Sequence, residues 1–247
     1  MARGAGKARV ELTMVVHRGE RSRPARVPRA LALGALVGVA LFCAFMTAAM
    51  RLYPGGTAFD RTTQGHSFWS NFWCDLRHDV ALSGVPNREA SLLAAVAFFS
   101  LVVGLLPFWR LLAQETQAAP RMQRTIWRLG VLGSFGMALV MLLPSDQFPR
   151  LHGTLVTLAG PCGIAAAVLG TLEGFRSRSL PAFISVLGLC MLLAALANLA
   201  QYARQFWLHT PGSLLLPAIQ KLATALFLSW VVAISVRSLR RLPPPAE

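Results

Sequence analysis

Six long runs of apolar residues, separated by short polar links, form the dominant pattern of this chain. Each run comes close to, or exceeds, the roughly 20 residues that an α-helix needs to cross the hydrocarbon core of a bilayer. The pattern therefore predicts an all-α, polytopic membrane protein, a bundle of six transmembrane helices. The expected spans are residues 30–50, 89–110, 126–143, 152–174, 181–202 and 213–236.

The composition supports a membrane environment. Hydrophobic residues make up 55% of the chain and charged residues 14%, whereas soluble domains carry roughly 25% charge. A net charge of +14 taken alone suggests nucleic acid. The basic residues, however, lie in short segments between apolar runs, as in the loops of membrane proteins. We therefore expect a lipid bilayer around the chain and no nucleic-acid partner.

The basic residues also predict an orientation. With six spans, the two tails and the even-numbered links hold 17 Lys or Arg, and the odd-numbered links hold six. Basic residues concentrate on the cytoplasmic side, so both termini are expected in the cytoplasm of a bacterial inner membrane. Residues 1–29 are expected to form a basic, disordered cytoplasmic tail, and residues 237–247 are expected to form a cytoplasmic tail with a Pro-rich end. The first run exceeds the core of a signal peptide, which favours a retained anchor.

Two local signals concern helix packing and helix ends. Gly34 and Gly38 form a small-xxx-small pair in the first predicted span, which allows another helix to approach closely. Asn87 precedes the second span and is a predicted N-cap.

Residues 53–87 are the only long polar stretch between two apolar runs. Within them, residues 67–79 are predicted to form a short amphipathic helix on the membrane surface. Its aromatic side would carry Phe68, Trp69, Phe72, Trp73 and Leu76. Asn71, Asp75 and His78 would share a ridge on the other side. Two interpretations are open: the ridge faces a polar site, or it is the wet side of an interfacial helix.

The third link is short and contains two prolines, Pro144 and Pro149. It is expected to hold Asp146 and His152 near each other at the outer mouth of the third and fourth spans. An Asp that orients a His supports a general base or a metal ligand. The alternative is a turn with an N-capping Asp and an interfacial His.

Lys221 follows Gln220 within the sixth span. A cation in hydrocarbon is costly unless it pairs or reaches the interface. If it pairs, Asp75 or Asp146 is expected within about 4 Å of Lys221 or of His152. If the helix begins late, Lys221 lies at the interface and needs no partner. Polar residues of the fifth span, namely Asn198, Gln201 and Tyr202, are expected to line the same pocket.

These residues predict one outer polar cluster: Asn71, Asp75, His78, Asp146, His152, Gln220 and Lys221. The leading hypothesis is a membrane protein that binds a lipid or a membrane-protein partner there, without a cofactor. The alternative is a metal-assisted hydrolase acting on a lipid headgroup, with zinc at Asp75, His78 and His152. A small-molecule transporter is third. No Walker motif, dinucleotide-binding glycine motif or G-x-S-x-G motif is present.

Several short motifs carry a family resemblance: F-W-x-N-F-W-C-D-L from residue 68, G-V-P-N before the second span, P-x-D and H-G around the third link, and Gln-Lys in the sixth span. Over residues 30–236 the chain resembles a family of uncharacterised six-pass bacterial membrane proteins, a domain-of-unknown-function family distantly similar to the DRAM and Frag groups. The resemblance implies a six-helix bundle and no established activity. The matching positions are Asn71, Asp75, Pro144, Asp146, His152, Gln220 and Lys221.

A second resemblance is to membrane-embedded metal hydrolases of the alkaline ceramidase type. Those enzymes use several His, an Asp and a Ser near one membrane face. This chain lacks an H-x-x-x-H pair.

Overall fold

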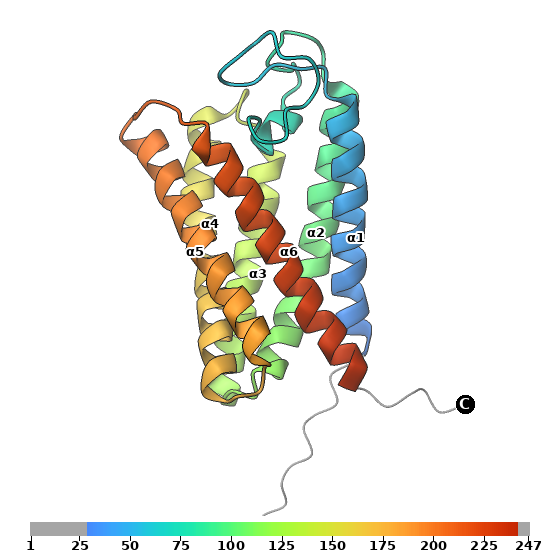
Figure 1. Ribbon diagram of the computed structural model, residues 1–247, viewed down its shortest axis with the longest axis vertical. Helices are drawn as coiled ribbons and strands as arrows, with labels where there is room; N and C mark the ends of the chain where they lie inside the picture. Colours follow the sequence, from blue (N-terminus) through green and yellow to red (C-terminus); the bar gives the residue numbers. More distant parts are fainter. Residues whose placement is uncertain (1–28, 242–247) are drawn as a thin grey trace, which may run out of the picture.

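The computed structural model describes residues 29–241, so the first predicted tail lies almost wholly outside the described residues, and of the second only residues 237–241 are described. Six helices in this range are long and apolar enough to cross a membrane, which confirms the predicted all-α, six-span architecture (Figure 1). They are α1 (Arg29–Leu52), α2 (Arg88–Glu115), α3 (Pro120–Leu142), α4 (Pro149–Arg176), α5 (Ala182–Trp207) and α6 (Leu215–Arg241). A short 3-10 helix, η1 (Cys74–Arg77), lies between α1 and α2, and residues 29–241 contain no strand.

Several helices extend beyond the predicted spans. The helix α6 continues to Arg241 although its apolar run ends near residue 236, and α5 continues to Trp207 instead of ending near residue 202. The length of an apolar run corresponds to the thickness of the hydrocarbon core of a bilayer. Arg, Gln and Leu are good helix formers, so the helices continue into the more polar region outside that core.

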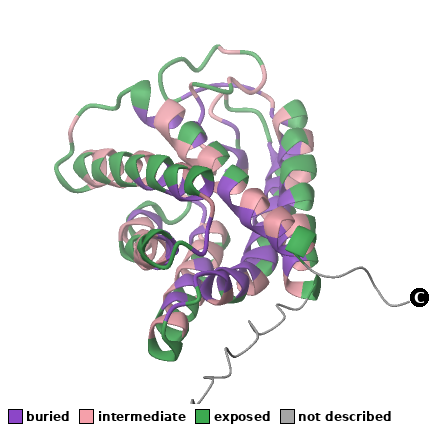
Figure 2. Cartoon of the chain, turned by 60° about the horizontal axis from the view of Figure 1, so that its bottom comes forward, coloured by how far each residue is buried: buried purple, intermediate pink, exposed green. Residues whose placement is uncertain are grey.

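The helices pack in chain order, and α6 closes the ring by packing against α1 and α2. The helix α2 also contacts α3 and α4. Half of its apolar window is buried, against a third or less for every other span, so α2 is the central helix. Buried residues line the inner faces of the helices, and exposed residues lie on the outer faces (Figure 2). The outer faces carry many exposed Leu, Val and Phe side chains, which suit contact with lipid.

The predicted small-residue pair lies at the contact between α1 and α2. A Cβ atom added to Gly38 would lie 2.5 Å from the Cα of Gly104, and one added to Gly34 would lie 3.2 Å from the ring of Pro107. Larger residues at these positions would push the two helices apart, so the pair allows close backbone packing as expected.

Residues 53–87 cover one end of the bundle, which we call the loop end; both ends of the described chain lie at the opposite, terminal end (Figure 1). Asn87 occupies the predicted N-cap position of α2 but makes no side-chain cap. Its Nδ2 instead donates to the carbonyls of Leu76 (3.2 Å) and His78 (2.9 Å). The amide therefore ties the covering segment to the start of α2.

The terminal end is fastened by a buried ion pair. Arg237 of α6 donates to Glu115 at the end of α2 over 2.5 Å, and the two side chains are only 10% and 7% exposed. The same guanidinium donates to the backbone carbonyl of Ser179 in the link between α4 and α5. The pair thus joins α2, α6 and the α4–α5 link.

Candidate functional site

Residues 67–79 do not form the predicted amphipathic helix. They form turns followed by the four-residue helix η1. The reason lies in their backbone N–H groups, which in a continuous helix would donate to backbone carbonyls of the same helix. The N–H of Phe72 donates to Asp75 Oδ2 (2.8 Å), and the N–H of Trp73 donates to Gln220 Oε1 (2.9 Å). Side chains that capture backbone donors compete with helix formation.

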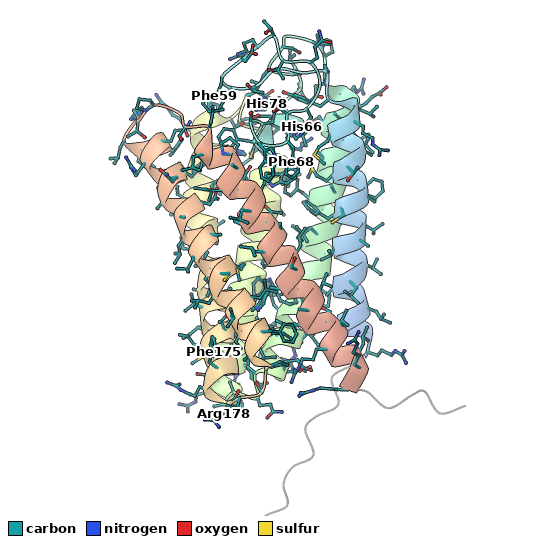
Figure 3. All side chains as sticks on the ribbon, in the orientation of Figure 1. Phe59, His66, Phe68, His78, Phe175 and Arg178 are labelled. Carbon is teal, nitrogen blue, oxygen red and sulfur yellow. The ribbon has the colours of Figure 1, made fainter. Side chains whose placement is uncertain are left out.

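The expected aromatic face is also divided. Phe68 and Trp69 are 40% and 61% exposed, whereas Trp73 and Leu76 are buried. Asn71, Asp75 and His78 are buried as well. These three polar side chains are therefore not on the wet side of a surface helix. Figure 3 shows the labelled Phe68 and His78 at the loop end, beneath the outermost part of the covering segment.

Asn71 and Asp75 form a buried hydrogen-bonded pair. Asn71 Nδ2 donates to Asp75 Oδ2 (3.0 Å) and to the carbonyl of Gly56 (2.8 Å), and its Oδ1 accepts from the N–H of Ser67. Gly56 has a φ of +82°, a conformation that favours glycine. Burial raises the pKa of Asp75 above its usual value, while its two hydrogen bonds act in the opposite direction.

Lys221 is buried, with 2% exposure, but its predicted ion pair is not formed. Among the described residues, no carboxylate lies within ion-pair distance of Lys221 or of His152. The Lys221 ammonium instead donates to the backbone carbonyl of Asn71 (2.5 Å) and lies 4.1 Å from the ring centroid of Trp73. A carbonyl oxygen and an aromatic face stabilise the cation in place of a carboxylate.

Three hydrogen bonds thus join residues 71–73 to one turn of α6. Besides the two bonds of Lys221 and Gln220, Trp73 Nε1 donates to Thr224 Oγ1 (3.1 Å). We call residues 71–73 the strap, because they hold the covering segment against α6. The Trp73 ring was expected to lie on the membrane surface. Its contact with Lys221 needs a partner 148 positions away in sequence, so local patterns carry no signal for it.

His78, Asp146 and His152 lie at the loop end without forming the predicted Asp146–His152 contact. Asp146 is exposed and accepts a hydrogen bond from the N–H of Asp79 (3.0 Å). His152 is buried, and its Nδ1 donates to the carbonyl of Leu143 (2.7 Å). The carbonyl at the end of α3 therefore orients the imidazole, the role expected of Asp146. His78 Nε2 lies 2.8 Å from Ser145 Oγ.

A polar pocket of about 380 Å³ opens between the strap, the α3–α4 link and the loop ends of α4, α5 and α6. It contains three of the seven predicted site residues. Its lining residues are Phe72, Cys74, Asp75, Ser145, His152, Tyr202, Gln205, Phe206, His209 and Gln220. Tyr202 was expected there. Asn198 and Gln201, predicted with it, are absent from the lining, and Gln205 and Phe206 were missed because α5 was expected to end near residue 202.

A second, apolar cavity of about 320 Å³ lies deeper, with walls from every helix except α1. Its lining includes Trp73, Trp109, Gly163 and Phe227. Cys74 and Gln220 line both the apolar cavity and the polar pocket. The two spaces therefore adjoin at these two side chains.

The zinc alternative needs Asp75, His78 and His152 in one ligand set. In residues 29–241, no three His, Cys, Asp or Glu side chains are grouped closely enough to hold a metal ion. His78 and His152 are each already bonded, to Ser145 and to Leu143. The described geometry therefore offers no support for a metal-assisted hydrolase.

Comparisons of this chain with protein-family models, with curated proteins and with solved structures find no match. The resemblance to the six-pass bacterial family therefore stays a prediction that rests on the short motifs alone.

Proposed function

We propose that this chain is an inner-membrane protein with cytoplasmic termini that binds a single lipid at its outer face. The polar part of the lipid occupies the pocket beside Asp75, and one acyl chain enters the apolar cavity. The observation that carries the proposal is the junction at Cys74 and Gln220, which line both spaces.

The two volumes suit this division of one amphipathic ligand. Ligand pockets occupy roughly 300–1,000 Å³ and combine apolar walls with a few polar groups that fix orientation. Here the apolar walls and the polar groups lie in separate, adjoining spaces. A ligand that fills both must itself have a polar end and an apolar end, which is the defining property of a lipid.

The orientation rests on charge. The loop end carries six Lys or Arg in its links, and the terminal end carries 17 when both tails are counted. By the positive-inside rule, the terminal end faces the cytoplasm and the polar pocket faces outward. The transporter hypothesis receives less support, since the deeper cavity is mostly apolar and would not favour a polar solute.

Tryptophan quenching by brominated lipid tests the proposal. Trp109 lines the apolar cavity and is 3% exposed, so lipid outside the bundle hardly reaches it. Protein in vesicles of lipids with bromine on the acyl chains should show quenching of Trp109, measured as the difference between the wild type and Trp109→Phe. Without such a difference the proposal is wrong.

A cavity-filling variant sharpens the test. Gly163 lines the cavity, and a Cβ atom added to it meets nothing within 4 Å. Gly163→Leu should therefore place its side chain in the cavity and abolish most of the Trp109 quenching. Ala40→Leu is the matched control, because Ala40 is exposed on the outer face of α1. The control should quench like the wild type.

A further inference from the structure

The unpaired groups of the polar pocket indicate which headgroup it accepts. Resting on the proposed function, we infer that the pocket selects a lipid whose headgroup is uncharged and rich in hydroxyls, and that it discriminates against phosphate.

Both donors and acceptors are left free in the pocket. Asp75 uses Oδ2 for its two hydrogen bonds, and its Oδ1 has no partner among the described residues although the side chain is 94% buried. Gln220 uses Oε1 to accept from Trp73, which leaves its Nε2 donors free. A hydroxyl group both donates and accepts, so hydroxyls can satisfy Asp75 Oδ1 and Gln220 Nε2 together.

The remaining lining adds groups of the same kind. The Tyr202 hydroxyl and the Gln205 amide are uncharged, and neither has a side-chain partner within the described part of the chain. The rings of Tyr202 and Phe206 are stacked, with centroids 6.3 Å apart. His152 donates through Nδ1 to a carbonyl, which leaves Nε2 as an acceptor in the neutral ring.

A phosphate would meet no Arg or Lys side chain here. These two residue types are common partners of phosphate, and neither lines this pocket. The nearest candidate, Lys221, is turned to the Asn71 carbonyl and the Trp73 ring. The one acidic residue of the lining, Asp75, would repel an anion when it is ionised.

An uncharged headgroup avoids the repulsion between an anion and the Asp75 carboxylate, and it can use the free donors and acceptors of the pocket.

The test compares two lipids with the same brominated acyl chains, a monohexosyl diacylglycerol and a phosphatidylglycerol. Both headgroups carry hydroxyls, so the phosphate is the main electrostatic difference. Each is titrated at pH 8 into vesicles of unbrominated phosphatidylcholine, with Trp109 quenching as the readout. We expect half-maximal quenching at a mole fraction at least about tenfold lower for the glycolipid.

The outcomes separate this inference from the proposed function. Equal quenching by both lipids, or stronger quenching by phosphatidylglycerol, overturns the headgroup inference and leaves lipid binding intact. No quenching by either lipid overturns lipid binding itself.

A variant tests the role of the carboxylate. Asp75→Asn removes the negative charge and keeps an oxygen that can accept from the N–H of Phe72. It should improve phosphatidylglycerol binding, so that the ratio of the two half-maximal mole fractions falls severalfold. Asp60→Asn is the control, because Asp60 is exposed and outside the pocket; it should leave the preference unchanged. An unaltered preference in Asp75→Asn would show that the carboxylate does not exclude phosphate.

Discussion

The two ends of α6 stabilise a buried cation in different ways. At the terminal end, Arg237 has a carboxylate partner, Glu115, and a carbonyl partner in the α4–α5 link. At the loop end, Lys221 has a carbonyl and an aromatic ring, and the nearby Asp75 uses only one carboxylate oxygen for the protein. At the terminal end, Arg237 and Glu115 therefore satisfy each other, whereas at the loop end the Asp75 carboxylate keeps one oxygen free beside a pocket.

This difference distinguishes a structural ion pair from a candidate ligand-binding site. A buried carboxylate paired with a guanidinium is stabilised by both charge and hydrogen bonds and has little left for a ligand. A carboxylate without a paired cation keeps an oxygen available, and its burial cost is offset only in part. Polar groups that the fold leaves unpaired are typical of ligand sites.

The largest expected effect is at the terminal end. Arg237→Met leaves Glu115 buried, with Arg241 at 3.8 Å as its remaining ion-pair partner among residues 29–241. Breaking a buried pair costs about 3–5 kcal/mol, and we expect roughly 3 kcal/mol because Arg241 compensates partly. Reversible unfolding in mixed micelles, followed by circular dichroism, measures the change in the free energy of unfolding.

The pair of Arg176 and Glu173, 3.0 Å apart, provides the matched control, because the Arg176 side chain is 81% exposed. Arg176→Met should cost less than about 0.5 kcal/mol, since an ion pair with an exposed arginine contributes little. Similar losses in the two variants would contradict the assignment of Arg237 as a fastening.

The fold could be predicted from the sequence because each helix that crosses a bilayer must be one continuous apolar run. Apolar runs long enough to cross a bilayer appear directly in the chain, and six helices follow from them. The predicted helix ends were less accurate than the number of helices. The helix α6, for example, continues to Arg241, because polar helix formers extend it past the hydrocarbon core.

The candidate site was predicted in part. The cost of a cation in hydrocarbon correctly directed attention to Lys221 and to the polar residues of the covering segment. The predicted partner of Lys221 was wrong, because a carboxylate is only one of the groups that can stabilise a buried ammonium. A backbone carbonyl freed by a non-helical strap, and the face of Trp73, were available only after the backbone had departed from the helix that periodicity predicted.

The next effect concerns the strap at the loop end. Lys221→Met keeps the length of the side chain and removes the bond to Asn71 and the contact with Trp73. Removing the ammonium also removes the cost of burying a charge. The net loss from these two interactions is therefore about 1–2 kcal/mol. We therefore expect the strap to open roughly tenfold more often, a smaller effect than at Arg237.

Cys74, next to the strap, reports this opening. In a chain with the other three cysteines changed to Ala, its labelling by a thiol reagent should be about tenfold faster in Lys221→Met. Burial raises the pKa of Cys74 to about 12, so at pH 8 the thiol is almost entirely protonated in the closed protein and reacts mainly when the strap opens. Arg204→Met, at an exposed position near the loop end of α5, should label like the parent. Unchanged labelling in Lys221→Met would mean that the ammonium does not hold the strap.

The smallest expected effect is a pH dependence of stability at the loop end. Burial, assisted by the positive charge of Lys221, lowers the pKa of His66 to about 4. The unfolded chain takes up a proton on this ring near its ordinary pKa of about 6.5, where the folded chain does not. This contribution to stability is therefore present above about pH 6.5 and is lost as the pH falls toward 4.

His66→Phe isolates this contribution. His66 makes an edge-on contact with Tyr53, with ring centroids 5.9 Å apart, which a phenyl ring can keep. Asp75 has a raised pKa and contributes in the opposite direction in both proteins, so it cancels in the comparison. Because His66 is only partly buried, we expect the wild type to lose about 1 kcal/mol more than His66→Phe between pH 7 and pH 5. Equal losses would show that His66 does not contribute to the acid sensitivity.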